Sequence, residues 1–287
     1  YPLTGVTLPD TPAYSTDGRL SANLQAAQGA SFNYQGFNGK IGDSDIHGDL
    51  AFVASQPRPR LSGNLVSNQL LFKDLAPLIG ADSNAEQKAR GGASKQPAGK
   101  VLPVEAFRTE RWRAMDADVT FAGKRIVHSA QLPFTDLSAH VVLEDGLLRL
   151  EPLRFGVAGG SLASNIRLDG RSVPLQGRAK LTARGFKLKQ LFPSVESMQT
   201  ALGQMNGEVA LAGRGNSVAA LLATGDGEVR MLVNDGVISR SLMEIAGLNV
   251  GNYVVSKLFG DDEVHINCTA ADMGIQDGLM KTRAFVI

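Results

Sequence analysis

Short runs of alternating apolar and polar residues recur along most of the chain. The clearest run, Leu137 to Glu144, leads into Asp145-Gly146 and is followed by a second apolar run, Leu147 to Leu150. Further runs occupy 162–168, 179–183, 208–212, 228–233 and 264–269. A period of two is typical of strands that bury one face. The pattern therefore predicts a mainly β protein.

Asp-Gly and Asn-Gly pairs recur between and beside these runs. Such pairs supply positive φ at both central residues of a two-residue hairpin turn. The eight pairs begin at Asp17, Asn38, Asp145, Asp169, Asn206, Asp226, Asp235 and Asp277. We therefore predict a long antiparallel meander.

Two segments change to a helical spacing of apolar residues. The first predicts a helix over 194–206, with Ser194 as the N-cap and Gly207 after the end. The second predicts helix over 239–259, divided by Gly247 and Gly251 into a helix-loop-helix cap over a sheet. Because no other segment has this spacing, we expect only a few short helices.

A change in composition divides the chain. Residues 80–100 are rich in Gly, Ala, Ser, Asn, Gln and Lys and have no apolar period, which is typical of a solvated loop. We predict a β-repeat segment over 1–80, a polar loop or linker over 81–101, and a second β segment over 102–287. A shift of 114 residues superposes Leu61-Ser62-Gly63 and Phe72-Lys73 on Leu175-Gln176-Gly177 and Phe186-Lys187, which indicates an internal repeat and an elongated array.

Composition excludes several function classes. The chain has 287 residues, 43% of them hydrophobic, and its 29 Lys and Arg nearly balance its 28 Asp and Glu, so nucleic acid is not an expected partner. Zinc-ligand spacings are absent from the sequence and the single Cys268 cannot form an internal disulfide, so we expect neither a metal nor a cofactor. The sequence has no membrane-spanning run and no leader at Tyr1, so we interpret it as a fragment of a longer protein.

Several sequence blocks between Leu102 and Gly170 form a combination that is specific as a set. They are Leu102-Pro103-Val104, Arg111 to Val119, Leu137-Ser138-Ala139, Asp145 to Phe155 and Ala158-Gly159-Gly160. Together these blocks resemble the AsmA family of bacterial envelope proteins. Gly247 to Asn252 and Leu258 to Asp262 are similar to the C-terminal part of the same family.

The resemblance implies a fold, a location and a function. The fold would be an elongated, curled antiparallel β-sheet, a repeating β-groove with an apolar interior, like that of eukaryotic bridge-like lipid transfer proteins. The chain would be the periplasmic region of a protein anchored in the inner membrane, its anchor lying outside this sequence. The expected function is phospholipid transport in outer-membrane assembly, without catalysis. Expected partners are phospholipid acyl chains, envelope membranes and outer-membrane assembly proteins.

The alternation of the predicted strands places one set of apolar residues on a single face. We expect this face to line the groove, because few helices and few large aromatics remain to cover it. The predicted lining residues are Leu137, Ala139, Val141, Leu143, Ile166, Leu168, Val209, Leu211, Val229 and Met231.

Other residue groups could carry chemistry but have simpler interpretations. His47, His128, His140 and His265 are scattered and lie beside no nucleophile motif; His140 should face solvent opposite Val141. Asp43, Asp45 and Asp49 lack the spacing of a calcium loop, and Asp261-Asp262-Glu263 is interpreted as a polar helix exit. Gly159-Gly160 predicts a β-bulge or a tight bend, and Cys268 is interpreted as a small buried residue.

Two alternatives stay open. Arg108, Arg111 and Arg113 around Trp112 could contact lipid headgroups, although a Trp that anchors a hairpin base with its arginines in water is the preferred interpretation. The protein could also be a structural or regulatory scaffold that influences targeting or insertion of outer-membrane proteins without carrying lipid.

Overall fold

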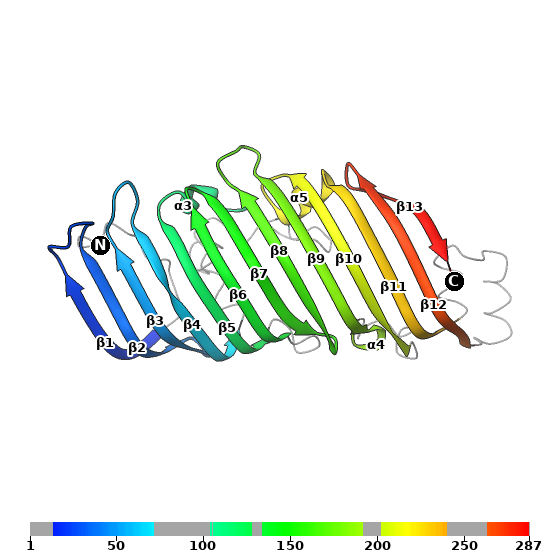
Figure 1. Ribbon diagram of the computed structural model, residues 1–287, viewed down its shortest axis with the longest axis horizontal. Helices are drawn as coiled ribbons and strands as arrows, with labels where there is room; N and C mark the ends of the chain where they lie inside the picture. Colours follow the sequence, from blue (N-terminus) through cyan, green and yellow to red (C-terminus); the bar gives the residue numbers. More distant parts are fainter. Residues whose placement is uncertain are drawn as a thin grey trace, which may run out of the picture.

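One sheet of thirteen strands makes up most of the protein (Figure 1). The structure is a computed structural model, and it describes residues 14–71, 104, 106–127, 134–191, 202–239 and 263–286. The strands are β1 (Tyr14–Asn23), β2 (Ser31–Ile41), β3 (Ser44–Val53), β4 (Arg60–Leu71), β5 (Asp116–Val127), β6 (Phe134–Glu144), β7 (Leu147–Val157), β8 (Gly160–Asp169), β9 (Gln176–Lys187), β10 (Leu202–Arg214), β11 (Asp226–Ser239), β12 (Glu263–Gln276) and β13 (Leu279–Val286). The predicted fold class is confirmed.

The strands lie in the sheet in the order in which they follow one another in the chain. Each described strand pairs antiparallel with its neighbours, except that β4 and β5 pair in parallel, from Arg60 opposite Asp116 to Leu71 opposite Val127. A parallel pair needs a crossover connection in place of a hairpin. The described part of this connection holds the short helix α3 (Thr109–Trp112). The predicted meander is therefore confirmed with one interruption.

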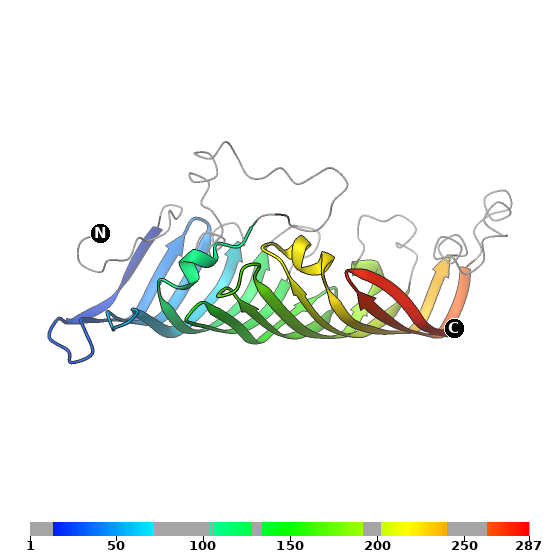
Figure 2. The same ribbon diagram turned by 90° about the horizontal axis from the view of Figure 1, so that it is seen from above.

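The strands bend, so that the sheet curls about its long axis and stays open on one side (Figure 2). Helices α3 and α5 (Val218–Ala223) lie at one rim, and α4 (Leu188–Leu191) lies at the other (Figure 1). Ser217 caps α5, since its side chain accepts a hydrogen bond from the Ala220 backbone N–H at 3.1 Å. The described helices are too short to form a second layer over the sheet.

Only some of the Asp-Gly and Asn-Gly pairs form the predicted hairpin turns. Asp145 and Gly146, with φ of 47° and 79°, form the turn between β6 and β7. Asp277 and Gly278, with φ of 48° and 71°, form the turn between β12 and β13. Ala158-Gly159 forms the same turn with φ of 49° and 71°, which confirms a tight bend beside Gly160. Asp169-Gly170 opens a longer loop, Asp226-Gly227 begins β11, and the pairs at Asp17, Asn38, Asn206 and Asp235 lie inside strands.

Close packing explains why a glycine can be required inside a strand. A Cβ added at Gly18 would lie 2.8 Å from both the Phe37 Cα and the Tyr34 ring. The rings of Tyr34 and Phe37 stack beside this position with centroids 5.1 Å apart. The glycine thus makes room for aromatic side chains, and the predicted turn at this pair is wrong.

The predicted helix over 194–206 is wrong over its last five residues. Residues 202–206 belong to β10, where Met205 pairs with Phe186 of β9 and Val233 of β11. Met205 packs against buried clusters that contain these two residues. Packing between strands therefore overrides the local helical spacing. Residues 194–201 of this predicted helix lie outside the described residues. Of the second predicted helix, Ser239 ends β11 and residues 240–259 lie outside the described residues. The predicted linker at 81–101 and Phe72-Lys73 of the predicted repeat also lie outside them.

An irregularity in β7 keeps its apolar residues on one side of the sheet. Leu148 and Leu150 pair with Leu168 and Ile166, and the register then shifts before Leu153 pairs with Ser164. Glu151 and Pro152 of β7 lie opposite the single residue Asn165 of β8, and this one extra residue lets the apolar positions change from even to odd numbers without changing face.

Candidate functional site

Strand register gathers the apolar residues onto one side of the sheet, which we call the apolar face. Directly paired residues of neighbouring strands share a face. One continuous series of pairs, the central row, crosses all thirteen strands. It contains Leu20, Tyr34, Leu50, Gly63, Val119, Val141, Leu150, Ile166, Ala179, Leu211, Gly227, Ile275 and Met280. Across the described strands, this row contains no charged residue.

A second series of pairs runs beside the central row on the same face. It contains Phe37, Gly48, Leu65, Phe121, Ala139, Leu153, Ser164, Leu181, Val209, Val229, Met273 and Thr282. The hydroxyl of Ser164 donates to the Leu153 carbonyl at 3.2 Å, so it does not break the apolar character of the row.

The apolar face is only partly covered by protein. Its central row is half-buried from Tyr34 in β2 to Ile275 in β12, and exposed at its two ends. By contrast, Leu175 in the loop after β8 is completely buried. A sheet face that packs against a full second layer has buried residues like Leu175. The half-buried row therefore has room for apolar contact with another molecule.

Helices α3 and α5 cover the apolar face at one rim. Leu221 of α5 and Leu168 of β8 both lie over Gly177, because a Cβ added at Gly177 would be 3.0 Å from the Leu221 side chain and 3.1 Å from that of Leu168. Trp112 of α3 is buried against Gly170, with Phe107 at a ring distance of 6.0 Å. Figure 2 shows α5 on the concave side of the sheet, so the apolar face is the concave one.

All ten residues predicted to line a groove lie on this face. Val141, Ile166 and Leu211 belong to the central row, and Ala139, Val209 and Val229 belong to the second. Leu143 pairs with Leu148 and Leu148 with Leu168, while Leu137 pairs with Gly123 and Met231 with Gly207. All ten are half-buried. The structure thus brings them together, and their contact with lipid stays a prediction.

Sequence reasoning missed the aromatic part of the face. Phe32, Tyr34 and Phe37 of β2 lie opposite Phe52, Leu50 and Gly48 of β3. Alternation in β2 could have indicated these residues, since Phe32 and Tyr34 are separated by one polar residue. The step of three from Tyr34 to Phe37 hides the pattern, because the register shifts between them.

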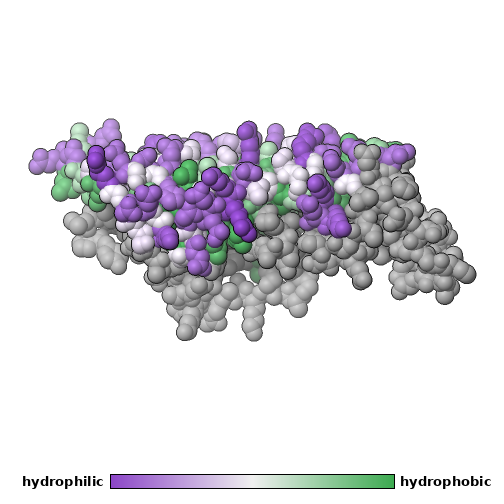
Figure 3. Space-filling model, turned by 90° about the horizontal axis from the view of Figure 1, so that it is seen from below, coloured by the Kyte–Doolittle hydropathy of each residue, from purple (hydrophilic) through white to green (hydrophobic). Residues whose placement is uncertain are grey.

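The opposite side, the polar face, carries ion pairs both between strands and within a strand. Arg184 meets Glu208 at 3.2 Å, and Glu228 meets Arg230 at 3.1 Å and Arg283 at 3.8 Å. Figure 3 looks onto one edge of the sheet, where the described side chains are mostly hydrophilic with smaller hydrophobic areas between them. The sheet therefore has one apolar and one polar face, as an antiparallel sheet with one solvated side requires.

His140 lies on the polar face, opposite in direction to Val141. Its Nε2 is 2.8 Å from Asp118 Oδ1, and Arg60 approaches the other oxygen of Asp118 at 3.4 Å. The hydrogen bond from His140 lowers the pKa of Asp118 below its ordinary value, against the opposing effect of burial. This cluster joins β4, β5 and β6, and Thr120, directly opposite His140, donates its hydroxyl to Asn64.

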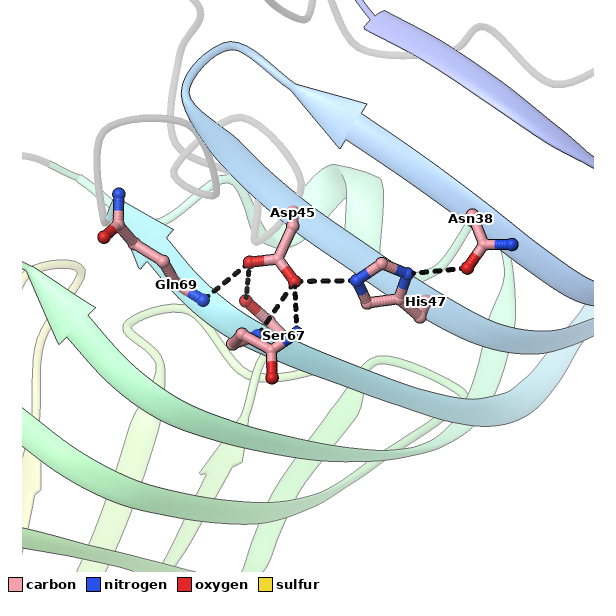
Figure 4. A network of polar contacts seen from close by, with 6 residues as sticks. Asn38, Asp45, His47, Ser67 and Gln69 are labelled. Atoms are coloured by element: carbon pink, nitrogen blue, oxygen red, sulfur yellow. Dashed lines mark hydrogen bonds and ion pairs between the residues drawn. The ribbon is translucent and has the colours of Figure 1, made fainter.

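Asp45 fastens the end of β4 to β3 (Figure 4). Its carboxylate accepts hydrogen bonds from the backbone N–H groups of Asn68 at 2.9 Å and Gln69 at 2.6 Å, and His47 Nε2 lies 2.7 Å away. Burial alone would raise the pKa of Asp45, but these hydrogen bonds hold it far below its ordinary value. His47 is in turn 3.0 Å from Asn38.

The aspartates near this network do not converge. Asp49 accepts a hydrogen bond from the Gly36 N–H of β2 at 2.8 Å, whereas the backbone N–H groups that bind Asp45 belong to β4. Among the described residues, no group of three His, Cys, Asp or Glu side chains could hold a metal ion. His128, Asp261 and Asp262 lie outside the described residues, and His265 and Glu263 belong to β12.

Two further placements bear on the sequence predictions. Cys268 is exposed beside Asn234, so the prediction of a buried cysteine is wrong. Its position alternates to the polar face, whereas its neighbour Thr269 alternates to the apolar face and is buried. Arg113 is exposed and Arg108 pairs with Glu110 at 3.4 Å, beside the buried Trp112.

No helix within the described ranges combines the length and the apolar character needed to cross a bilayer.

Comparison with known proteins places the chain in a family. A sequence model of the AsmA family matches residues 1–285. The chain is also 54% identical over 293 residues to the AsmA family protein YhjG of Escherichia coli (strain K12). This alignment covers 99% of the chain and 43% of the relative, so the chain spans less than half of that protein's length. No solved structure matches the chain. Because the family match extends over nearly the whole sequence, the chain belongs to the AsmA family.

Proposed function

We propose that the apolar face binds the acyl chains of phospholipids and guides them along the sheet, without catalysis. The observation that supports this most is the central row, which is uncharged on all thirteen strands and half-buried over most of its length. The lipid headgroup would stay in water at the open rim. The apolar tail would supply the covering layer that the short described helices do not.

The dimensions of the row suit long apolar chains. Thirteen strands leave twelve intervals of about 4.8 Å, so the row is roughly 58 Å long. This exceeds the roughly 30 Å hydrocarbon core of a bilayer. Several acyl chains could therefore lie end to end, or one could move from strand to strand.

The energetics favour binding with easy movement. A buried methylene contributes about 0.8 kcal/mol, and an acyl chain on an open face buries about half of its surface, so ten methylenes gain roughly 4 kcal/mol. Moving the acyl chain by one strand interval exchanges one apolar contact for a similar one. Charged residues would interrupt this movement, because an unpaired charge beside an acyl chain is costly.

The family suggests where this activity would operate. We propose that the chain is the periplasmic part of an envelope protein that is anchored in the inner membrane and contributes to outer-membrane assembly. Envelope membranes and outer-membrane assembly proteins would then be its partners. Because the chain spans less than half of its relative, the remainder of such a protein could extend the same apolar face.

Photo-crosslinking from matched positions tests the proposal. A crosslinkable residue at Val141 or Ile166, on the apolar face, is expected to capture phospholipid during expression in a Gram-negative host. Ser138 and His140, which belong to the same strand as Val141 and point to the polar face, are the controls. Mass spectrometry of the adducts would identify the lipid. Equal capture from both faces, or no lipid in any sample, would refute lipid carriage and favour the scaffold that influences insertion of outer-membrane proteins.

A further inference from the structure

Three arginines lie side by side on the polar face, in a group that we call the arginine row. Arg149 of β7 pairs directly with Arg167 of β8, and Arg167 pairs directly with Arg178 of β9. Directly opposite residues in an antiparallel pair have Cβ atoms about 5 Å apart. Three positive charges therefore lie within about 10 Å of sheet. Like charges placed directly opposite destabilise a sheet, so this arrangement is costly for the fold alone.

Nearby carboxylates neutralise only part of the positive charge of the arginine row. Arg149 meets Glu144 at 3.5 Å. Asp169 lies two residues beyond Arg167, but Arg171 binds both of its oxygens, at 2.8 and 2.6 Å. Within the described residues, no carboxylate lies at ion-pairing distance from Arg167 or Arg178, and both arginines are exposed. The next pair along these strands, Asn165 opposite Lys180, adds further hydrogen-bond donors.

Elsewhere on the polar face, arginines are neutralised by nearby carboxylates. Arg184 of β9 has Glu208 of β10 as its partner at 3.2 Å, and Arg230 of β11 has Glu228 at 3.1 Å. Arg167 and Arg178 depart from this pattern on two neighbouring strands, because Asp169, whose charge also acts on Arg167, already binds Arg171. Their exposed guanidinium groups are therefore open to an anion from outside the described residues.

We infer that the arginine row is a binding site for a phosphate-bearing anion. Guanidinium groups bind phosphate through two parallel hydrogen bonds, and a tetrahedral phosphate has enough oxygens to bridge two guanidiniums on neighbouring strands, whose Cβ atoms are about 5 Å apart. An acidic peptide fits this spacing less well, because alternate side chains of an extended strand repeat at about 6.6 Å. The phosphate could belong to a lipid headgroup at a membrane surface or to a soluble molecule. The site lies opposite the apolar face and does not depend on lipid carriage there.

The test compares the wild-type protein with Arg167→Gln and Arg178→Gln. Arg184→Gln is the matched control, because Arg184 is an exposed arginine of the same face that already has a carboxylate partner. Calorimetry with pyrophosphate measures binding of a soluble phosphate, and succinate serves as a carboxylate dianion for comparison. Co-sedimentation with phosphatidylcholine vesicles, with and without phosphatidylglycerol, measures binding of lipid headgroups.

We expect each row variant to bind the anion about tenfold more weakly or worse, which corresponds to one lost charge-assisted hydrogen-bond pair. Arg184→Gln should bind like the wild type, and the melting temperatures of the row variants should be unchanged or higher, since a like-charge contact is removed. Pyrophosphate binding without vesicle binding would identify a soluble source, and vesicle binding that pyrophosphate competes away would identify the headgroup. Equal binding by wild type and row variants, an equal loss in the Arg184 variant, tighter binding of succinate, or no binding of either probe would overturn the inference.

Discussion

A carboxylate introduced at Val141 should leave the protein folded, whereas the same change at Leu175 should unfold it. Val141 is half-buried in the central row, and Leu175 is completely buried. Complete burial of a valine side chain is worth about 1.5–3 kcal/mol, so removing a half-buried one costs roughly 1 kcal/mol. The new carboxylate in Val141→Asp can keep its hydration if the face is open.

A carboxylate introduced at Leu175 could not stay hydrated, because this position is completely buried. Its backbone N–H donates to Asn216 Oδ1 at 3.1 Å and its carbonyl accepts from the Gly215 N–H at 2.8 Å, which fixes the side chain inside the rim. An unpaired carboxylate buried there costs several kcal/mol, a large share of the 5–15 kcal/mol by which domains are usually stable. Leu175→Asp should therefore be unfolded or strongly destabilised.

Urea denaturation followed by circular dichroism measures this contrast. Ser138→Asp is the control, because Ser138 is an exposed residue of the same strand on the polar face, opposite Ala122. Its unfolding free energy should stay within about 0.5 kcal/mol of the wild type. In the same preparations, Val141→Asp should lose co-purifying phospholipid while Ser138→Asp retains it. A Val141→Asp protein as unstable as Leu175→Asp would show a closed protein core at the apolar face and refute the reasoning.

Three further outcomes follow from the described contacts and the sequence. Asp45→Asn should destabilise the protein by about 2 kcal/mol or more, because the N–H groups of Asn68 and Gln69 lose a charged acceptor. Folding lowers the pKa of Asp45, so the stabilisation by its carboxylate is complete above the unfolded pKa of about 3.9. This stabilisation is lost as the pH falls through the folded pKa. The melting temperatures of wild type and Asp45→Asn should therefore approach each other at acid pH. Gly146→Val should cost about 1–3 kcal/mol in denaturant titrations, because φ at this residue is 79°, and an unchanged midpoint would contradict this. Deleting 82–99, which has no apolar period, should leave the melting temperature nearly unchanged, whereas a large drop would assign it a covering role.

The sequence was informative wherever a strand alternates without interruption between two tight turns. The hairpin from Leu137 to Leu150 has both properties, and its predicted faces agree with the register. The parallel pairing of β4 and β5 has no such local signal, because it depends on how the whole intervening connection returns. Asn-Gly and Asp-Gly pairs inside strands were equally misleading, since a glycine that makes room for a neighbour cannot be told locally from a glycine that turns.

The arginine row shows why part of a site escapes sequence reasoning. Counting back from the turn at Ala158-Gly159 would place Arg149 opposite Leu168, on the wrong side of the sheet. The bulge at Glu151 and Pro152 shifts the pairing by one residue and brings Arg149 opposite Arg167. A one-residue shift exchanges the faces of a strand, so a charge pattern across strands becomes visible only when every bulge is located.

The sequential strand order has a consequence for how the protein folds and comes apart. Each strand of the sheet pairs only with strands next to it in the chain, so cooperativity passes from neighbour to neighbour as in a repeat protein. Hairpins such as β6–β7 can form early and independently, because their contacts are close in sequence. The β4–β5 junction must instead wait until the ends of a long connection meet, and this carries an added loop-closure entropy. The junction is therefore the expected boundary between two cooperative units, β1–β4 and β5–β13, which hydrogen exchange would detect as separate opening free energies.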